Sequence, residues 1–133
     1  MTVVFDTNIL VSALAFPGGR AEQALNRIVQ GQDRLVLSKA ILDELLGVLA
    51  QKFSRDPEEL ARVAVWLADA AEWVHPNLRL HVVADEADNR ILECALAGGA
   101  SLIVTGDHGL LQLKGFEGVR IITLREYLLP RKS

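Results

Sequence analysis

The chain has 133 residues, half of them apolar, so it is long enough to bury a core as one domain over residues 1–133 and too apolar to be disordered. A formal net charge of −3 argues against a protein that coats nucleic acid through broad electrostatics. No apolar run approaches the ~18–20 residues of a membrane span. The single cysteine, Cys94, and the absence of a secretory pattern at the start lead us to expect a cytoplasmic protein without membrane contact.

Strands and helices are predicted to alternate along most of the chain. In the first half we expect a strand over residues 2–6, helices over 9–15 and 20–30, a strand over 34–37, and helices over 39–53 and 57–71. In the second half we expect extended segments over 74–75 and 80–83, a helix over 86–97, strands over 101–105 and 119–122, and a short terminal helix. Since the strands are nearly continuous apolar runs, this order predicts a three-layer α/β/α sandwich with a central parallel sheet.

Residues suited to helix caps support several of these boundaries. Asn8 and Ser38 each precede an expected helix, and their side-chain oxygens suit the N-cap position. Asp56 is followed by a proline, which favours the first helical position. Thr123 is followed three residues later by a glutamate, which predicts a capping box.

Four acidic residues stand out by their positions in this pattern: Asp6, Glu44, Asp88 and Asp107. Asp6 ends the first strand, and Asp107 follows the strand over 101–105 after one glycine. Asp88 lies in the first turn of the helix over 86–97, and Glu44 lies inside the helix over 39–53. If the strands are parallel, these strand ends and helix starts share one edge of the sheet, where open α/β sheets place their ligands.

Each acid also has a plainer explanation. Asp6 alone suits a helix cap and Asp107 suits a turn, while Asp88 suits the third position of a helix capped by Asp85. Glu44 resists such an explanation, because it borders an apolar stripe and has no basic residue four positions away on either side.

Bringing four carboxylates together is costly. Two of them ~4 Å apart repel by about 4 kcal/mol at an effective dielectric constant near 20. Hard divalent cations with oxygen ligands, Mg²⁺ or Mn²⁺, are the natural counter-charge. Such ions activate water and steady a leaving oxygen, which is the chemistry of metal-assisted phosphodiester hydrolysis.

Four stretches taken in order resemble the PIN-domain nucleases, in particular the VapC-like toxin components of bacterial toxin–antitoxin pairs: Asp6-Thr-Asn8, Ser38 to Glu44, Asp88 before Ile91-Leu-Glu-Cys-Ala95, and Thr105-Gly-Asp107. The resemblance covers essentially the whole chain. It implies a Mg²⁺- or Mn²⁺-dependent endoribonuclease with Asp6, Glu44, Asp88 and Asp107 as the catalytic, metal-binding acids. It also implies that Asn8 and Thr105 support the site by hydrogen bonds, that the chain forms a homodimer, and that a cognate antitoxin holds it inactive.

The chain departs from the family pattern at two positions. Many relatives carry an acid two residues after the Asp107 position, where this chain has Gly109, and another directly after the Asp88 position, where it has Asn89. The number of metal ions, one or two, is therefore left open.

Other residues are interpreted more plainly. His75, His81 and His108 are too scattered for a zinc site. We expect Cys94 in the core, and Trp66 and Trp73 in the core or at a dimer contact. Five basic residues are candidates for RNA phosphates or for solvated faces: Arg20, Arg27, Lys52, Arg55 and Arg90.

Two rival functions stay open beside the ribonuclease. One is a PIN-fold module that binds RNA or a partner without cutting it, which the reduced set of acids favours. The other, weaker, is a phosphatase or receiver-like protein with Asp6 as phosphoryl acceptor. The haloacid-type pattern of such enzymes has a second aspartate where this chain has Asn8.

Overall fold

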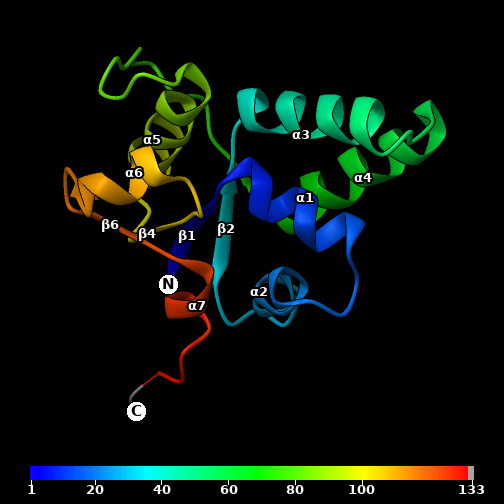
Figure 1. Cartoon of the computed structure of the whole chain (residues 1–133), viewed down its shortest axis with the longest axis horizontal. Helices are drawn as coiled ribbons and strands as arrows, with labels where there is room; N and C mark the ends of the chain where they lie inside the picture. The colour runs from blue at the N-terminus through cyan, green and yellow to red at the C-terminus, as the bar shows by residue number, and fades with distance from the viewer. Residues whose placement is uncertain (132–133) are drawn as a thin grey trace.

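The computed structural model describes residues 1–131 as a mixed α/β fold (Figure 1). Its elements are β1 (Thr2–Phe5), α1 (Thr7–Ala15), α2 (Arg20–Val29), β2 (Arg34–Leu37), α3 (Lys39–Lys52), α4 (Pro57–Ala70), β3 (Glu72–Trp73), α5 (Glu86–Gly98), β4 (Leu102–Val104), α6 (His108–Leu113), β5 (Gly115–Phe116), β6 (Val119–Ile122) and α7 (Leu124–Tyr127). Within these residues, no helix is both long and apolar enough to cross a membrane.

The strands form one sheet in the order β3-β2-β1-β4-β6-β5, parallel throughout except for the β5–β6 pair. From β1 the chain moves outward to β2 and β3, then returns to place β4 on the other side of β1. Helices α1 to α4 lie on one side of the sheet and α5 and α6 on the other (Figure 1). The predicted three-layer sandwich with a mostly parallel central sheet is therefore confirmed.

The central strands hold the core because both of their faces are covered by helices. Every residue of 3–5, 35–37 and 102–104 is at most 5% exposed, as the continuous apolar runs of the sequence predicted. Helix α3 adds Ile41, Leu45 and Leu49 to this core. Leu46 of the same helix, which was expected on the apolar stripe beside Glu44, is only partly buried.

A buried polar cluster closes the end of the sheet where β1 begins. Asp33 is 3% exposed and accepts hydrogen bonds from the Tyr127 hydroxyl and the Arg131 guanidinium. Arg27 stacks over the Tyr127 ring and donates to its backbone carbonyl. These contacts join α2 to α7 and the following segment, and sequence patterns did not predict them.

Most predicted elements and caps are confirmed. Ser38 accepts from the Ile41 N–H, Asp56 accepts from the Glu59 N–H, and the capping box at Thr123 is complete. The cap at Asn8 is wrong, because α1 begins two residues earlier than expected, at Thr7, and Asp6 occupies the N-cap position.

The extended segments of the second half are also partly wrong. Residues 80–83 form no strand, and the pairing with β2 lies at Glu72–Trp73 rather than at 74–75. The short elements α6 and β5 were not predicted, because runs of six and two residues are too short to show a helical or strand pattern of apolar residues.

Two helical glycines make a matched test of packing. A Cβ at Gly98 would lie 2.8 Å from Val36 Cγ1, while a Cβ at Gly47 of α3 would meet nothing within 4 Å. We expect Gly98→Ala to destabilise the fold by about 1–3 kcal/mol, because the stiff Val36 side chain must move. Gly47→Ala should stabilise it by about 0.5–1 kcal/mol through helix propensity. Urea unfolding of both variants measures the two changes, and equal stabilities would contradict the packing of α5 against β2.

Candidate functional site

The site is built where the order of the sheet reverses. β1 and β4 are neighbours, but the chain leaves them in opposite directions, and their carboxyl ends are the place where open α/β sheets bind ligands. Asp6 directly follows β1, and its N–H donates to the Val104 carbonyl at 3.0 Å. Thr105 directly follows β4, and its N–H donates to the Ile122 carbonyl at 3.0 Å. Sheet hydrogen bonds therefore fix the backbone of both residues beside each other.

Thr105 joins two of the acids. Its Oγ1 donates to Asp6 Oδ2 at 2.6 Å and accepts from the Asp107 N–H at 3.0 Å. Thr105 is fully buried and Asp6 is 5% exposed. Burial raises the pKa of Asp6, and the Thr105 hydrogen bond partly offsets this effect. The Thr7 and Asn8 N–H groups also hold the Asp6 pKa down, although the Asp6 side chain makes no capping hydrogen bond of normal geometry.

Asp88 and Asp107 are directly coupled. Burial, the side-chain hydrogen bond with Asp107 and the charges of Asp107, Asp85 and Asp6 raise the pKa of Asp88 to about 8. The Asp107 pKa is lowered by this hydrogen bond, by backbone N–H groups and by the charge of His108, against the effect of burial. Asp107 Oδ2 accepts from the Leu110 N–H at 3.0 Å, which favours its ionised form. The pair therefore shares one proton, held on Asp88 and donated to Asp107.

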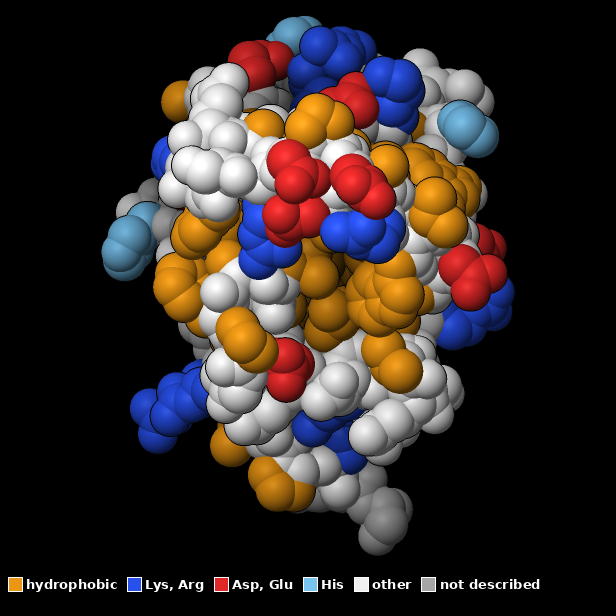
Figure 2. All heavy atoms as spheres, turned by 90° about the vertical axis from the view of Figure 1, so that its right-hand side faces the viewer, with side chains coloured by type: hydrophobic (Ala, Val, Ile, Leu, Met, Phe, Trp, Pro, Cys, Tyr) orange, Lys and Arg blue, Asp and Glu red, His pale blue; other side chains and the backbone are white. Residues whose placement is uncertain are grey.

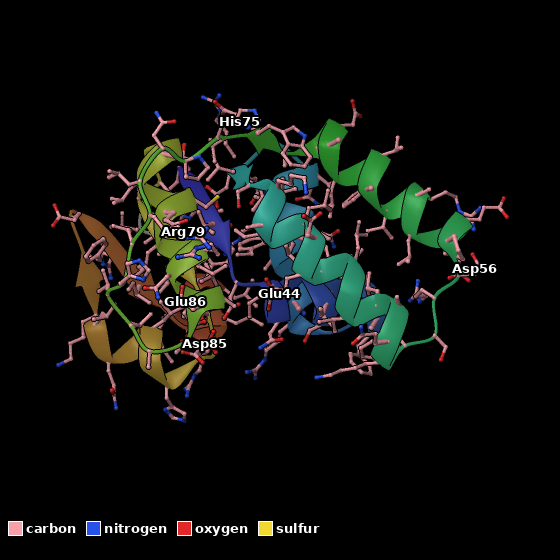
Figure 3. All side chains as sticks on the ribbon, turned by 90° about the horizontal axis from the view of Figure 1, so that it is seen from above. Glu44, Asp56, His75, Arg79, Asp85 and Glu86 are labelled. Atoms are coloured by element: carbon pink, nitrogen blue, oxygen red, sulfur yellow. The ribbon has the colours of Figure 1, made fainter. Side chains whose placement is uncertain are left out.

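Glu44 approaches from α3 on the other layer. Partial burial, followed by the charges of Asp6 and Asp85, raises its pKa. Figure 3, seen from above, shows Glu44 on α3 and Asp85 at the start of α5 on the same face of the molecule. Glu44 is more exposed than the three aspartates, so it stands at the rim of the site.

A fifth carboxylate, Asp85, was missed as a site residue. The sequence pattern predicted Asp85 only as a helix cap. Asp85 Oδ1 does accept hydrogen bonds from the Ala87 and Asp88 N–H groups, at 2.8 and 3.4 Å. Its charge also raises the pKa of both Glu44 and Asp88. Its position three residues before Asp88 was the only available sign, and capping explained it fully.

Gly109 and Asn89, the two positions where the chain departs from the family pattern, lie in different surroundings. A Cβ at Gly109 would lie 3.1 Å from Asp107 Oδ2 and 3.8 Å from Asp88 Oδ2, so this position faces the acids. Asn89 is fully buried and faces away from them. Its Oδ1 accepts from the Val82 and Val83 N–H groups at 2.9 and 3.0 Å, and its Nδ2 donates to the Val83 carbonyl at 2.8 Å.

The acids have no lysine or arginine partner among the described residues. Within residues 1–131, no ion pair joins Asp6, Glu44, Asp88 or Asp107 to a lysine or arginine. In the same part of the chain, no three His, Cys, Asp or Glu side chains are close enough to hold one ion as they stand. The acids are thus gathered at one edge and linked in pairs, without a closed ligand set.

Several other predicted residues have structural roles. The Asn8 side chain makes no hydrogen bond within the described chain, so only its backbone N–H reaches Asp6. Cys94 is fully buried, and burial raises its pKa to about 12. Trp73 packs against the core, whereas Trp66 is 41% exposed.

Three of the five basic candidates make internal contacts. Arg27 bonds the Tyr127 carbonyl, and Arg55 contacts Glu59 and the Leu14 carbonyl. The Arg90 side chain is 11% exposed and is held by Glu86 and Glu93. These three therefore have structural roles inside the fold.

The raised pKa values give the metal-free protein a definite pH dependence. A carboxyl whose pKa rises on folding stabilises the fold below its unfolded pKa and loses that contribution as the pH rises through its folded pKa. With EDTA present, we expect the melting temperature to fall as the pH rises from the ordinary aspartate value of 3.8 toward about 8. Asp88→Asn should flatten this fall, because the amide keeps the hydrogen bond to Asp107 without titrating.

The control for this experiment is Asp43→Asn, which removes an exposed carboxylate that pairs with Lys39 outside the site. It should keep the wild-type pH profile. A flat wild-type profile, or an Asp88→Asn profile that falls as steeply as the wild type, would contradict the shared proton.

Comparison with known proteins places this geometry in a family. The sequence model of the PIN domain matches residues 2–109. An uncharacterised protein of Methanocaldococcus jannaschii is 28% identical over 116 residues, which cover 84% of this chain and 74% of that protein.

Solved structures share the fold at low identity. VapBC2 from Rickettsia felis, bound to a DNA fragment from its promoter, superposes with a TM-score of 0.66 at 16% identity, covering 92% of this chain and 98% of the other. VapBC-1 from nontypeable Haemophilus influenzae gives 0.62 at 20% identity, covering 94% and 99%. FitAcB from Neisseria gonorrhoeae gives 0.55 at 14% identity, covering 92% and 98%. With a family match over most of its length and the acids gathered at the switch point of the sheet, the chain belongs to the PIN-domain family.

Proposed function

We propose that this protein is a Mg²⁺- or Mn²⁺-dependent endoribonuclease and the toxin of a toxin–antitoxin pair. The observation that carries the proposal is the group of unneutralised carboxylates at the carboxyl ends of β1 and β4. Asp6 and Asp107 follow strands β1 and β4, and Asp88 lies in α5. The charge of Asp107 raises the pKa of both Asp6 and Asp88, and Asp88 shares a proton with Asp107. Such mutual repulsion is tolerated where a cation is to bind.

The donor set fits a hard divalent cation. Its members are carboxylate oxygens, which Mg²⁺ and Mn²⁺ prefer, and Glu44 adds a further carboxylate at the rim. Asp6, Glu44, Asp88 and Asp107 would hold the ion, and small side-chain movements would be needed because no three are yet close enough. When bound, such an ion lowers the pKa of water and neutralises charge at a phosphodiester.

The residues of the chain prepare the site for this chemistry. Thr105 fixes Asp6 through a buried hydrogen bond, and the Leu110 N–H fixes Asp107. Asp88 holds the proton that the pair shares, and this proton must leave before both carboxylates can act as ionised ligands. The site therefore loads more readily as the pH rises.

RNA cleavage tests the proposal directly. We expect the wild type to cut single-stranded RNA with Mg²⁺ or Mn²⁺ and to stop with EDTA. Asp6→Asn and Asp107→Asn should each lower the rate by about a hundredfold or more, the scale seen when one charge-stabilising group is removed from an active site. Thr105→Val should cost roughly 10–100-fold, because it frees the Asp6 carboxylate.

Asp43→Asn is again the matched control and should cut like the wild type, since Asp43 lies on α3 beside Glu44 but pairs with Lys39. Cleavage that survives EDTA, or that persists in both Asp6→Asn and Asp107→Asn, would refute the metal-dependent nuclease.

A non-catalytic PIN module is the second candidate, because the described acids do not form a closed set of three ligands. Retained RNA binding without turnover at any Mg²⁺ or Mn²⁺ concentration would favour that function over the nuclease.

An exposed apolar face supports the antitoxin part of the proposal. Figure 2 shows hydrophobic side chains gathered around a hollow below a group of charged side chains, on the face of the molecule that lies to the right in Figure 1. Trp66 lines two adjoining hollows, one along α4 with Val65 and one against α1 and α2 with Leu14 and Val29. Val65, Trp66 and Val29 are 70%, 41% and 58% exposed, and a contiguous exposed apolar patch is typical of an interaction surface. An antitoxin segment is the proposed occupant.

Expression in a bacterial host tests the toxin role. We expect the wild-type chain, produced without a partner, to arrest growth because it degrades RNA. Asp6→Asn should not arrest growth, whereas Asp69→Asn, which changes an exposed carboxylate on α4, should arrest it like the wild type. Normal growth with the folded wild type present would contradict the toxin role. The homodimer is part of the same proposal, and light scattering of the purified chain measures it.

A further inference from the structure

A segment before α5 is fixed against that helix although it forms no strand. Residues 77–84, here called the strap, run above α5 in Figure 1. The Leu80 N–H donates to Glu93 Oε2 at 2.7 Å, and the Leu80 carbonyl accepts from Arg90 Nη2 at 3.1 Å. Asn89 binds the strap nearer the start of α5, through the hydrogen bonds to residues 82 and 83 described above.

The strap is held by buried groups and is therefore rigid at Leu80. Glu93 is 5% exposed, and its carboxylate also pairs with Arg90 at 2.9 Å. Breaking these contacts would leave a buried charge without a partner, which is strongly unfavourable. Arg79 directly precedes this fixed point, so its backbone is held in place while its side chain is exposed.

Arg79 lies on the same face of the molecule as Glu44 and Asp85 (Figure 3). Figure 3 shows Arg79 beside α5, with Glu86 and Asp85 farther along toward the start of the helix. Leu80 bonds Glu93, which is eight residues after Asp85, so Leu80 and the adjoining Arg79 lie roughly 12 Å along the helix from Asp85 at 1.5 Å per residue. This separation leaves the acids free of the guanidinium.

The guanidinium of Arg79 is also free to bind an anion. Within residues 1–131, Arg79 makes no ion pair or side-chain hydrogen bond, whereas Arg90, Arg55 and Arg27 are all engaged inside the fold. An acidic site repels the phosphates of an incoming RNA strand, so a fixed positive charge beside it is needed to hold the strand. Arginine suits this task because its guanidinium binds phosphate oxygens bidentately.

We propose that Arg79 binds a backbone phosphate of the RNA substrate, so that the strand runs along the strap to reach the acids. This inference rests on the proposed ribonuclease function and names the residue that positions its substrate. Arg79 was not among the basic residues suggested by the sequence, because only the strap's contacts with α5 show that it is fixed near the site.

RNA binding without cleavage tests the role of Arg79. The full chain with Asp107→Asn is the background, and the probe is a short fluorescein-labelled single-stranded RNA of mixed sequence, read by anisotropy at several salt concentrations. Adding Arg79→Ala should weaken binding by about fivefold or more for every sequence. It should also reduce the salt slope by about 0.7, the value for one phosphate contact on a single strand. Arg79→Lys should restore part of the affinity.

Arg62→Ala is the matched control, because Arg62 is an exposed arginine on α4, on the other side of the sheet from α5. It should leave both the affinity and the slope unchanged. Equal affinities and slopes for the Arg79→Ala and Arg62→Ala proteins, or no RNA binding by either, would overturn the role of Arg79. Metal-dependent cleavage by the otherwise unchanged chain, with the same KM before and after Arg79→Ala, would overturn it while leaving the ribonuclease function intact.

Discussion

The repulsion among carboxylates at one edge of the sheet is the constraint on which this site depends. Asp6 is almost fully buried, and Asp88 and Asp107 lie close enough to share a proton. Since no lysine or arginine of residues 1–131 pairs with them, the fold tolerates these groups by protonation, by hydrogen bonds to Thr105 and backbone N–H groups, or by a bound cation. The structure shows the hydrogen bonds, and the raised pKa of Asp88 favours protonation. A cation is the counter-charge that would replace the proton.

The sheet order explains why these acids meet although they are distant in the chain. Asp6 and Thr105 follow adjacent parallel strands, so ladder hydrogen bonds place their backbones side by side at the carboxyl ends of those strands. Asp107 follows within two residues, and α5 crosses back over the sheet to bring Asp88 to the same edge. A parallel sheet can place polar side chains here without disturbing its buried faces, because the strands have already ended.

Sequence patterns were sufficient to predict the fold and the gathering of the four acids at one edge of the sheet, but not the contacts around them. Continuous apolar strands and the caps at Ser38, Asp56 and Thr123 are local signals, and local hydrogen bonds determine them. Asn8 failed as a cap because the sheet bond of Asp6 to Val104 sets where α1 begins, and this contact spans almost a hundred residues.

The basic residues show the same limit. Arg90, predicted as a possible RNA contact, is instead buried against Glu93. Nothing in its immediate sequence distinguishes it from Arg79, which remains exposed on the strap. The difference arises from how the strap folds back on α5, and this depends on contacts between residues ten or more positions apart.

The geometry of α5 shows which family departure matters. Consecutive residues of a helix point about 100° apart, so Asp88 and Asn89 face different surroundings. Asp88 faces Asp107, while Asn89 uses both its oxygen and its nitrogen to bind the strap. An aspartate at position 89 would not join the acids and would place a carboxylate oxygen against the Val83 carbonyl. The asparagine therefore removes nothing from the site, whereas Gly109 faces Asp107 and Asp88 so closely that even a Cβ there would lie only 3.1 Å from Asp107 Oδ2.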